Sequence, residues 1–559
     1  MTARPFPWEK SYPPILSWDT PLEVTTVPAL LDGAVAVYGA RPAIDYRGTR
    51  LSFADLGARA DEAAAAFLHA GIGRGQTLAL YLPNTAWQPI AFFAGLRTAA
   101  RLVLLSPLDA EAELAYKLKD AGARVLVTTD IQPMFAMALR LLDGGHVERL
   151  IVCPEATLGA VQGEVPTLPI PDRPDVVAWT DFARGITRPA NWPPLAPSDL
   201  ALLQYTGGTT GRPKGAMLTH ANLTAACAIF DAWYEGGGGA PAEGAKVIGV
   251  LPLFHIYALT VVLLRNVQRG AEILLRLRFD VETTLRDIEV MRANSFPGVP
   301  TMWLALLNHP GIETRDLSAL AYAGSGGAPL PVEAARRFEA LTGRRMLGGW
   351  GMTETSPAGT SLLADGPPKP GSIGLPMPGI EMDVVALDDP TRVLGPNETG
   401  EIRIKGPNVV AGYWNRPEET AAAFADGRLL TGDVGYMDED GYFFIVDRKK
   451  DMIISGGFNV YPQMVEQAIY THPAVAECLV VGVPDAYRGE SAKAFVVLRP
   501  GAAAFTLQEL QAFLADKVGR HEMPRDLEFR DALPKTAVGK FSKVALRDEE
   551  RARVRAGAA

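Results

Sequence analysis

A segment rich in glycine and threonine, residues 205–215, most constrains what this chain can fold into. It reads Tyr-Thr-Gly-Gly-Thr-Thr-Gly-Arg-Pro-Lys-Gly and follows an apolar run at residues 200–203. Glycines let successive backbone N–H groups converge on an anion, and threonine hydroxyls and a lysine ammonium add donors. The segment is not a Walker A loop, because no Gly-Lys-Ser/Thr follows at the required spacing. The alternative is a flexible glycine turn. Phosphate binding is the better prediction, with the candidate residues Thr206, Gly207, Gly208, Thr209, Thr210, Gly211 and Lys214.

Short apolar runs alternate with amphipathic segments through the first part of the chain. This alternation predicts an α/β fold in which helices cover parallel sheets. The expected strands are residues 77–82, 102–105 and 124–127, and the expected helices are residues 54–70 and 111–121. A proline-rich stretch with weak periodicity, residues 154–197, is interpreted as a surface connection.

The chain is too long for one ordinary core, and its last hundred or so residues read as a separate α+β unit. Strands are expected at residues 475–483 and 492–498, and an amphipathic helix at residues 507–518. A charged joint at residues 447–451, Asp-Arg-Lys-Lys-Asp, precedes this unit and suits a water-exposed boundary.

Charge and cysteine content narrow the class of protein. With 54 Lys and Arg against 63 Asp and Glu, the net charge of −9 argues against nucleic acid as the main partner. Three scattered cysteines without CxxC spacing predict neither a disulfide framework nor a zinc site and favour the cytoplasm. The first ten residues contain no apolar run typical of a secretory signal. The apolar run at residues 256–264 is too short to span a bilayer, which leaves peripheral membrane contact open.

Five further motifs follow the glycine-rich segment in a fixed order, and together they resemble the adenylate-forming superfamily. That superfamily includes acyl-CoA synthetases, peptide-synthetase adenylation domains and firefly luciferase, and the resemblance runs from about residue 22 to about residue 548. The motifs are residues 251–255 (Leu-Pro-Leu-Phe-His), 348–355 (Gly-Gly-Trp-Gly-Met-Thr-Glu-Thr), 431–433 (Thr-Gly-Asp), 447–451 and 534–540 (Pro-Lys-Thr-Ala-Val-Gly-Lys). Six motifs in order are far more specific than any one of them. The resemblance implies an enzyme that uses ATP and Mg²⁺ to activate a carboxylate.

The resemblance assigns a role to each motif. Glu354 is similar to the family's Mg²⁺ ligand, with Thr206 as a second candidate ligand, and Thr353 to the residue that bonds the α-phosphate. Taken alone, Thr353 and Glu354 could be a solvated helix cap. Lys540 matches the mobile catalytic lysine, whose ammonium can bridge the attacking carboxylate and the α-phosphate.

The nucleotide pocket is also implied by resemblance. Asp433 looks like the carboxylate that accepts both ribose hydroxyls, although the motif alone would be an ordinary turn. Arg448 is similar to the residue that reaches the nucleotide, although such charges are usually solvated. Trp350 stands where the family usually has a tyrosine stacked on adenine. The other residues implied in this pocket are Gly326, Gly327, Ala328, Pro329 and Gly351.

In this family the second half-reaction, transfer of the acyl group from the adenylate to coenzyme A, requires the C-terminal domain to rotate. The resemblance therefore implies a large N-terminal domain of stacked sheets and helices at residues 1–447, a hinge at residues 448–451, and a small mobile α+β domain at residues 452–559. Lys450 matches the hinge position. Ser455, Gly456 and Gly457 would line the tunnel for the pantetheine arm of coenzyme A, where missing side chains leave room.

The expected acid is a fatty acid of medium or long chain. His255 cannot supply the fixed negative charge that would hold an amino-acid ammonium, and it fits a wall near the carboxylate and thiol entry; a packed core histidine is the alternative. Residues 295–307 are largely apolar and would border the acyl tunnel, unless they are an ordinary buried helix start. Residues 446–453 and 457–462 look especially like bacterial long-chain fatty-acid ligases.

Other readings of the chain stay open at this point. A dicarboxylate ligase of the pimeloyl type would need a deep cation, which Arg265 or Arg292 could supply. An adenylation enzyme could load a carrier protein, although no carrier domain is attached. A silent binding protein would be expected to lose Lys540, Glu354 or Asp433, and a luciferase-like oxygenase cannot be argued from the fold. The sequence leaves the oligomeric state unknown.

Overall fold

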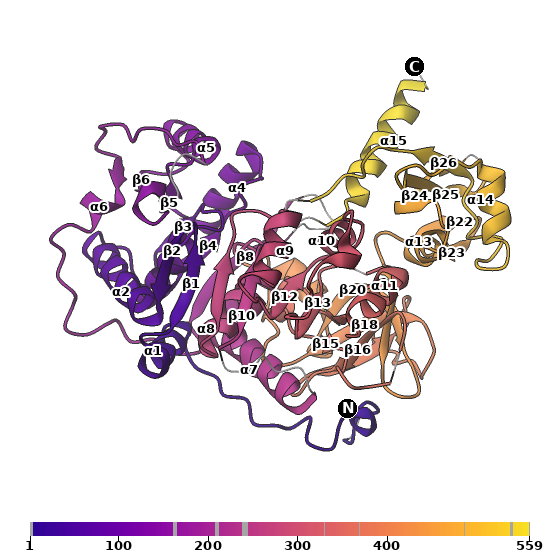
Figure 1. The fold of residues 1–559 in the computed structure, drawn as a ribbon, viewed down its shortest axis with the longest axis horizontal. Coiled ribbons are helices and arrows are strands. Elements are labelled where there is room, and N and C mark those ends of the chain that lie inside the picture. Colours follow the sequence, from indigo (N-terminus) through magenta and orange to yellow (C-terminus); the bar gives the residue numbers. More distant parts are fainter. Residues whose placement is uncertain are drawn as a thin grey trace.

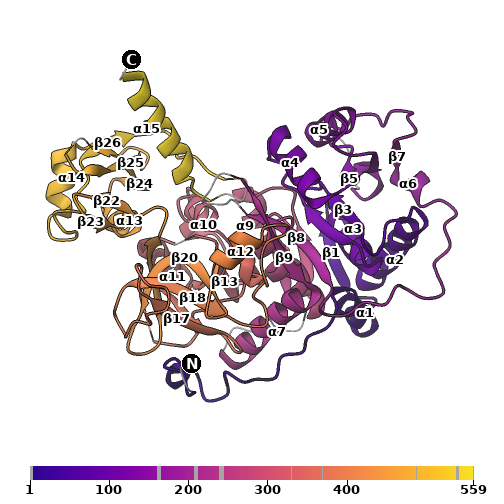
Figure 2. The ribbon, with the colours of Figure 1, turned by 180° about the vertical axis from the view of Figure 1, so that it is seen from behind.

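The computed structural model describes residues 4–159, 165–206, 212–237, 244–328, 330–367, 369–485, 487–536 and 540–557. Figure 1 shows a broad body made of the N-terminal and central parts of the chain, with a smaller unit at one end formed by the C-terminal part. The view from behind in Figure 2 shows the same separation, with helix α15 (Lys543–Gly557) rising from the smaller unit. The expected α/β fold with a small C-terminal unit is confirmed.

The N-terminal sheet carries the glycine-rich segment at one edge. Its strands pair in parallel apart from the last, and they run in the order β7 (Val176–Ala178), β6 (Arg149–Cys153), β5 (Val125–Thr129), β3 (Thr77–Leu80), β4 (Arg101–Leu104), β8 (Leu200–Thr206) and β9 (Lys214–Thr219). Helix α2 (Phe53–His69) precedes β3, and the helices that follow strands of this sheet include α3 (Trp87–Arg97), α4 (Glu111–Ala121), α5 (Gln132–Asp143) and α6 (Trp179–Phe182). The predicted alternation of strands and helices is confirmed here.

Local signals set the ends of these helices. At the start of α2, Ser52 and Asp55 form a reciprocal capping box, which satisfies backbone donors that the first turn leaves free. At the end of α4, Gly122 takes a left-handed conformation with φ +67°. The interpretation of residues 154–197 as a surface connection is wrong in part. Val176 to Ala178 form edge strand β7 beside β6, because three consecutive small apolar residues can pair there between the prolines.

The central sheet is the largest and supplies most of the candidate site. Its central strands, from β14 to β1, are parallel, and antiparallel strands continue it on both sides. The order is β17 (Glu381–Val385), β18 (Gly400–Lys405), β20 (Arg428–Met437), β21 (Phe443–Arg448), β16 (Ser372–Pro376), β15 (Thr360–Ser361), β14 (Leu347–Trp350), β13 (Tyr322–Ser325), β12 (Ser295–Gly298), β10 (Lys246–Gly249), β11 (Glu272–Leu275), β1 (Pro42–Tyr46) and β2 (Thr49–Ser52), with β19 (Phe424–Ala425) pairing with β20.

Helices around the central sheet include an unusual one. The apolar run noted in the sequence forms a π-helix, η3 (Ala258–Leu264), which is wholly buried. Such helices are rare and often occur at functional sites. The other helical segments are α1 (Val27–Tyr38), α7 (His220–Gly237), α8 (Arg265–Gln268), α9 (Val281–Glu289), α10 (Pro300–Leu307), α11 (Val332–Thr342), α12 (Pro417–Ala422), and the 3₁₀ turns η1 (Glu9–Ser11), η2 (Glu155–Thr157), η4 (Ile312–Thr314) and η5 (Thr353–Thr355).

The C-terminal unit is built on its own sheet and core. The sheet contains β23 (Phe458–Val460), β22 (Ile453–Ser455), β25 (Gly489–Leu498), β24 (Val475–Asp485) and β26 (Asp526–Phe529), packed with α13 (Pro462–Tyr470) and α14 (Leu507–Leu514). The two predicted strands are confirmed, and the predicted helix is shorter at its C-terminal end. Across the described residues, no helix is both long and apolar enough to cross a bilayer.

Candidate active site

The described residues on either side of the glycine-rich segment pair as antiparallel strands. Thr206 at the end of β8 pairs with Lys214 at the start of β9. The Lys214 ammonium lies 5.3 Å from the centre of the Tyr413 ring, close enough for a cation–π contact. Gly207, Gly208, Thr209, Thr210 and Gly211 lie outside the described residues.

Glu354 is a buried carboxylate with a defined partner. It lies in the 3₁₀ turn η5, next to Thr353, and only 5% of its surface is exposed. The Tyr413 hydroxyl donates a hydrogen bond of 2.8 Å to its Oε1, and the Val410 N–H donates to its backbone carbonyl. Burial raises the pKa of Glu354 above its ordinary value. Tyr413 thus links the carboxylate to Lys214, a connection that the sequence motifs do not indicate.

The residues expected around the ribose meet on one carboxylate. The register of β20 and β21 places Asp433 opposite Arg448, and Arg448 Nε lies 3.2 Å from Asp433 Oδ1. The indole N–H of Trp350 donates a hydrogen bond of 2.7 Å to Asp433 Oδ2. Only 3% of the surface of Asp433 is exposed, and this burial raises the pKa of its carboxyl group. The tryptophan therefore holds Asp433 in place through a nitrogen that a tyrosine would lack.

Lys540 reaches the central sheet from the C-terminal unit. A Cβ atom at Gly327 would lie 2.5 Å from Lys540 Cε and 2.9 Å from Nζ, so the lysine lies directly against this glycine. Its backbone is held to Thr536 by hydrogen bonds in both directions. Burial, followed by the charge of Arg448, lowers the pKa of Lys540 to about 8.

His255 and Lys540 line one small pocket. The other residues around it are Leu251, Pro252, Tyr257, Ala258 and Val299. Burial, followed by the charge of Lys540, lowers the pKa of His255 to about 3, so the imidazole is neutral near pH 7. Its Nδ1 accepts from the Tyr257 backbone N–H at 3.2 Å, which places the ring proton on Nε2. The histidine can therefore donate a hydrogen bond without carrying charge.

The remaining predicted residues divide into three groups. Gly326 and Gly327 lie against Tyr257 and Lys540, two residues that line the pocket, and Ala328 follows them, whereas Pro329 lies outside the described residues. Gly351 has a packing reason to be glycine, because a Cβ there would overlap the Pro357 carbonyl oxygen. Ser455, Gly456 and Gly457 belong instead to the β22–β23 turn of the C-terminal sheet, where Ser455 pairs with Gly489 and the Gly456 N–H donates to the Arg488 carbonyl.

Arg265 and Arg292 are the candidate deep cations for a second carboxylate. Arg292 is on the surface, with 52% of its side chain exposed and an ion pair to Asp316. Arg265 is buried, and its Nε lies 2.9 Å from Asp231 Oδ1. Arg292 is therefore excluded from this role by its position, and Arg265 already has a carboxylate partner.

Comparisons with known proteins agree with this geometry. A model of the AMP-binding enzyme family matches residues 31–414, and a model of the AMP-binding enzyme C-terminal domain matches residues 464–540. A long-chain-fatty-acid–CoA ligase of Bacillus subtilis (strain 168) is 39% identical over 563 residues, covering 97% of this chain and 98% of its own. A feruloyl-CoA synthase of an Amycolatopsis species is 38% identical over 507 residues, covering 90% and 95%.

Solved structures lead to the same conclusion. The crystal structure of ATP-bound MatB from Rhodopseudomonas palustris matches with a TM-score of 0.83 at 29% identity, covering 94% of this chain and 99% of that chain. The chain therefore belongs to the AMP-binding enzyme family. Within that family it is an AMP-forming acyl-CoA ligase, whose substrates are a carboxylic acid, ATP and coenzyme A.

Proposed function

We propose that this protein is an ATP-dependent fatty acid–CoA ligase for medium- or long-chain acids. It would form an acyl-adenylate with release of pyrophosphate and then transfer the acyl group to coenzyme A with release of AMP. The supporting observation is that Lys540, from the C-terminal unit, meets the His255 pocket at Gly327. The acid's carboxylate and the phosphates of ATP are both negatively charged, so an enclosed Lys540 ammonium beside the neutral His255 donor would lower the cost of bringing them together.

In the first step, the acid's carboxylate attacks the α-phosphate of ATP. The Lys540 ammonium lies between the two groups and neutralises the charge that they bring together. His255 donates its Nε2 proton in a hydrogen bond to the carboxylate, which orients it. Thr353 bonds the α-phosphate, and the phosphate loop with Lys214 holds the other phosphates. Asp433 receives the ribose hydroxyls, and Arg448 reaches the nucleotide.

The described residues fit a magnesium ion that is held mainly by the nucleotide. They contain no cluster of three or more His, Cys, Asp or Glu side chains that could cage a metal by themselves. Mg²⁺ commonly takes one or two protein carboxylates together with substrate phosphates. Glu354 would supply that carboxylate and Thr206 a hydroxyl, and the ion would neutralise phosphate charge.

The second step would require the C-terminal unit to rotate. We propose a hinge at residues 448–451, between β21 of the central sheet and β22 of the C-terminal sheet, with domains at residues 1–447 and 452–559. Rotation would withdraw Lys540 and bring Ser455, Gly456 and Gly457 to the pantetheine arm. These residues form a turn in which Gly456 and Gly457 have φ of +59° and +83°.

The preference for a fatty acid rests on similarity and on the ion pair that Arg265 already makes with Asp231. The Bacillus relative bears the name of a long-chain-fatty-acid–CoA ligase. Arg265 is paired with Asp231, which weakens the alternative of a dicarboxylate ligase. An enzyme that loads a carrier protein would share the first step only. We place the activity in the cytoplasm, with peripheral membrane contact left open.

The test is to measure AMP release and CoA-thioester formation with monocarboxylates of increasing length and with matching dicarboxylates. Turnover that rises with apolar chain length supports the proposal. A preference for the second carboxylate would favour the dicarboxylate alternative. AMP without thioester would favour a carrier protein as the acceptor.

A further inference from the structure

Gly324 in strand β13 and Gly326, which directly follows the strand's last residue, each lie against a tyrosine ring. Side chains alternate along a strand, so Tyr322 and Gly324 share one face of β13. A Cβ at Gly326 would lie 2.8 Å from Tyr257 Cζ, and a Cβ at Gly324 would lie 2.5 Å from the Tyr322 hydroxyl oxygen. The Tyr257 ring therefore covers Gly326, and the Tyr322 ring covers Gly324 two residues earlier. Gly326 is the neighbour of Gly327, against which Lys540 lies.

A buried polar cluster closes the far end of this row. The Tyr322 and Tyr234 hydroxyls are 2.9 Å apart, and the Arg265 guanidinium lies over the Tyr234 ring at 4.5 Å from its centre. Arg265 is 4% exposed, and its Nη2 has no hydrogen-bond partner among the described residues. The walls around the two tyrosines are apolar and include Val261, Phe230 and Leu347.

We propose that Tyr257 and Tyr322 occupy the space into which the alkyl chain of the acid extends, and that Tyr322 with Tyr234 and Arg265 sets the longest chain accepted. This inference rests on the proposed activity towards monocarboxylates. The chain would start at Lys540 and His255, pass over Gly326 as Tyr257 turns aside, and continue over Gly324. An apolar chain that went further would bury against the unpaired Arg265 nitrogen, which is unfavourable without a polar partner.

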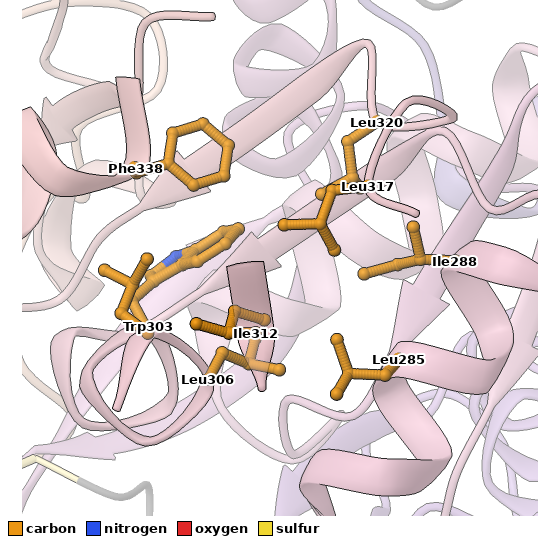
Figure 3. Close-up of a pocket in the computed structure, with 9 residues that line it drawn as sticks. Leu285, Ile288, Trp303, Leu306, Ile312, Leu317, Leu320 and Phe338 are labelled. Carbon is orange, nitrogen blue, oxygen red and sulfur yellow. The ribbon is translucent and has the colours of Figure 1, made fainter. Parts of the chain in front are cut away.

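The apolar void in Figure 3 is the competing location for the chain. It has a volume of about 10 Å³, and its side chains come from α9, α10, α11 and neighbouring turns. It lies on the other face of the sheet: the Trp303 ring packs against Phe296 at a tilt, and a Cβ at Gly298 would lie 2.8 Å from Trp303 Nε1. Phe296 and Gly298 pair with Ala323 and Ser325, which alternate with Tyr322 and Gly324.

The apolar segment expected to border the acyl tunnel, residues 295–307, contributes side chains to both locations. Val299 lines the pocket of His255 and Lys540, whereas Trp303 and Leu306 line the void of Figure 3. The pocket of His255 and Lys540 is equally small, about 10 Å³, so side chains must move before an alkyl chain enters at either location. On the tyrosine-covered side, Tyr257 both lines the pocket of Lys540 and covers Gly326, which connects that side to the reacting groups.

Two matched variants separate the two locations. Tyr322→Ala and Leu306→Ala each remove a large buried side chain, one on each face of the sheet. We would measure kcat/KM for CoA-thioester formation with saturated monocarboxylates of increasing length. With Tyr322→Ala, the preferred length should shift to longer acids, and kcat/KM for the first acid beyond the wild-type preference should rise about tenfold or more. Leu306→Ala should leave the preferred length unchanged.

The opposite pattern, a shift with Leu306→Ala alone, would place the chain in the void of Figure 3 and overturn the inference. An unchanged preference in both variants would also overturn it. If Tyr322→Ala does not fold, Tyr322→Leu takes its place, because leucine is shorter than tyrosine and still fills the apolar wall. Failure of the wild-type protein to form a thioester with any monocarboxylate would instead count against the proposed function.

Discussion

Replacing Trp350 with phenylalanine tests whether its indole N–H positions Asp433, the carboxylate proposed to bind the ribose. The variant keeps an aromatic ring at the proposed adenine pocket but removes the 2.7 Å hydrogen bond to Asp433 Oδ2. Hydrogen bonds to charged groups contribute about 1.5–3 kcal/mol. Without this bond, Asp433 is free to turn away from the ribose hydroxyls that it is proposed to accept.

The expected result for Trp350→Phe is a rise in KM for ATP of about 10- to 100-fold, since each 1.4 kcal/mol is a factor of ten. The change in kcat should be much smaller, because Lys540 and Glu354 are untouched. The assay is AMP formation at saturating acid and CoA over a range of ATP concentrations, together with Tm.

The matched control is Trp18→Phe, which removes an indole hydrogen bond of the same length, from Trp18 Nε1 to the Ile380 carbonyl, in the N-terminal segment. This variant should alter Tm without altering KM for ATP. If Trp350→Phe behaves in the same way, its indole contributes only to packing, and the positioning argument fails.

Three further predictions concern the reacting groups. Lys540→Ala should slow adenylate formation by about 10²–10³-fold yet largely spare thioester formation from supplied acyl-adenylate, whereas Lys535→Ala, on the surface, should affect neither; equal loss of both steps would contradict the assignment. Because the pKa of Lys540 is lowered to about 8 and its charged form is the active one, kcat/KM for adenylate formation should fall as pH rises through about 8. A pH profile in which Lys540→Ala retains that fall would exclude Lys540 as its source. Tyr413→Phe removes the donor to Glu354 Oε1 and should raise the Mg²⁺ concentration needed for half-maximal rate about 10- to 100-fold, and an unchanged Mg²⁺ titration would show that Glu354 does not hold the ion.

Local signals in the sequence were sufficient to predict the fold class and the strand that precedes the glycine-rich segment. The apolar run before Tyr205 ends in the hairpin of β8 and β9, as expected for a strand followed by glycines. The edge strand β7 was missed because its three residues stand among prolines, and only the neighbouring β6 makes them a strand. A pattern that short carries no period of its own.

Side-chain partnerships between distant segments could not be predicted. Nothing local to Trp350 indicates that its nitrogen meets Asp433, and nothing local to Tyr413 indicates that it holds Glu354. These contacts depend on how strands and turns far apart in the chain are brought together. The spacing of Tyr322, Gly324 and Gly326 at every second residue is visible in the sequence. The residues that contact them, Tyr257 at Gly326 and Tyr234 at Tyr322, come from other segments and could not be predicted.

The most direct test of the central claim is a rapid-quench experiment with labelled ATP, a fatty acid and the wild-type protein, first without coenzyme A and then with it. The account predicts that acyl-adenylate accumulates on the protein without coenzyme A, and that its addition converts the adenylate into equal amounts of AMP and acyl-CoA. Formation of ADP, or of acyl-CoA without a preceding adenylate, would contradict it.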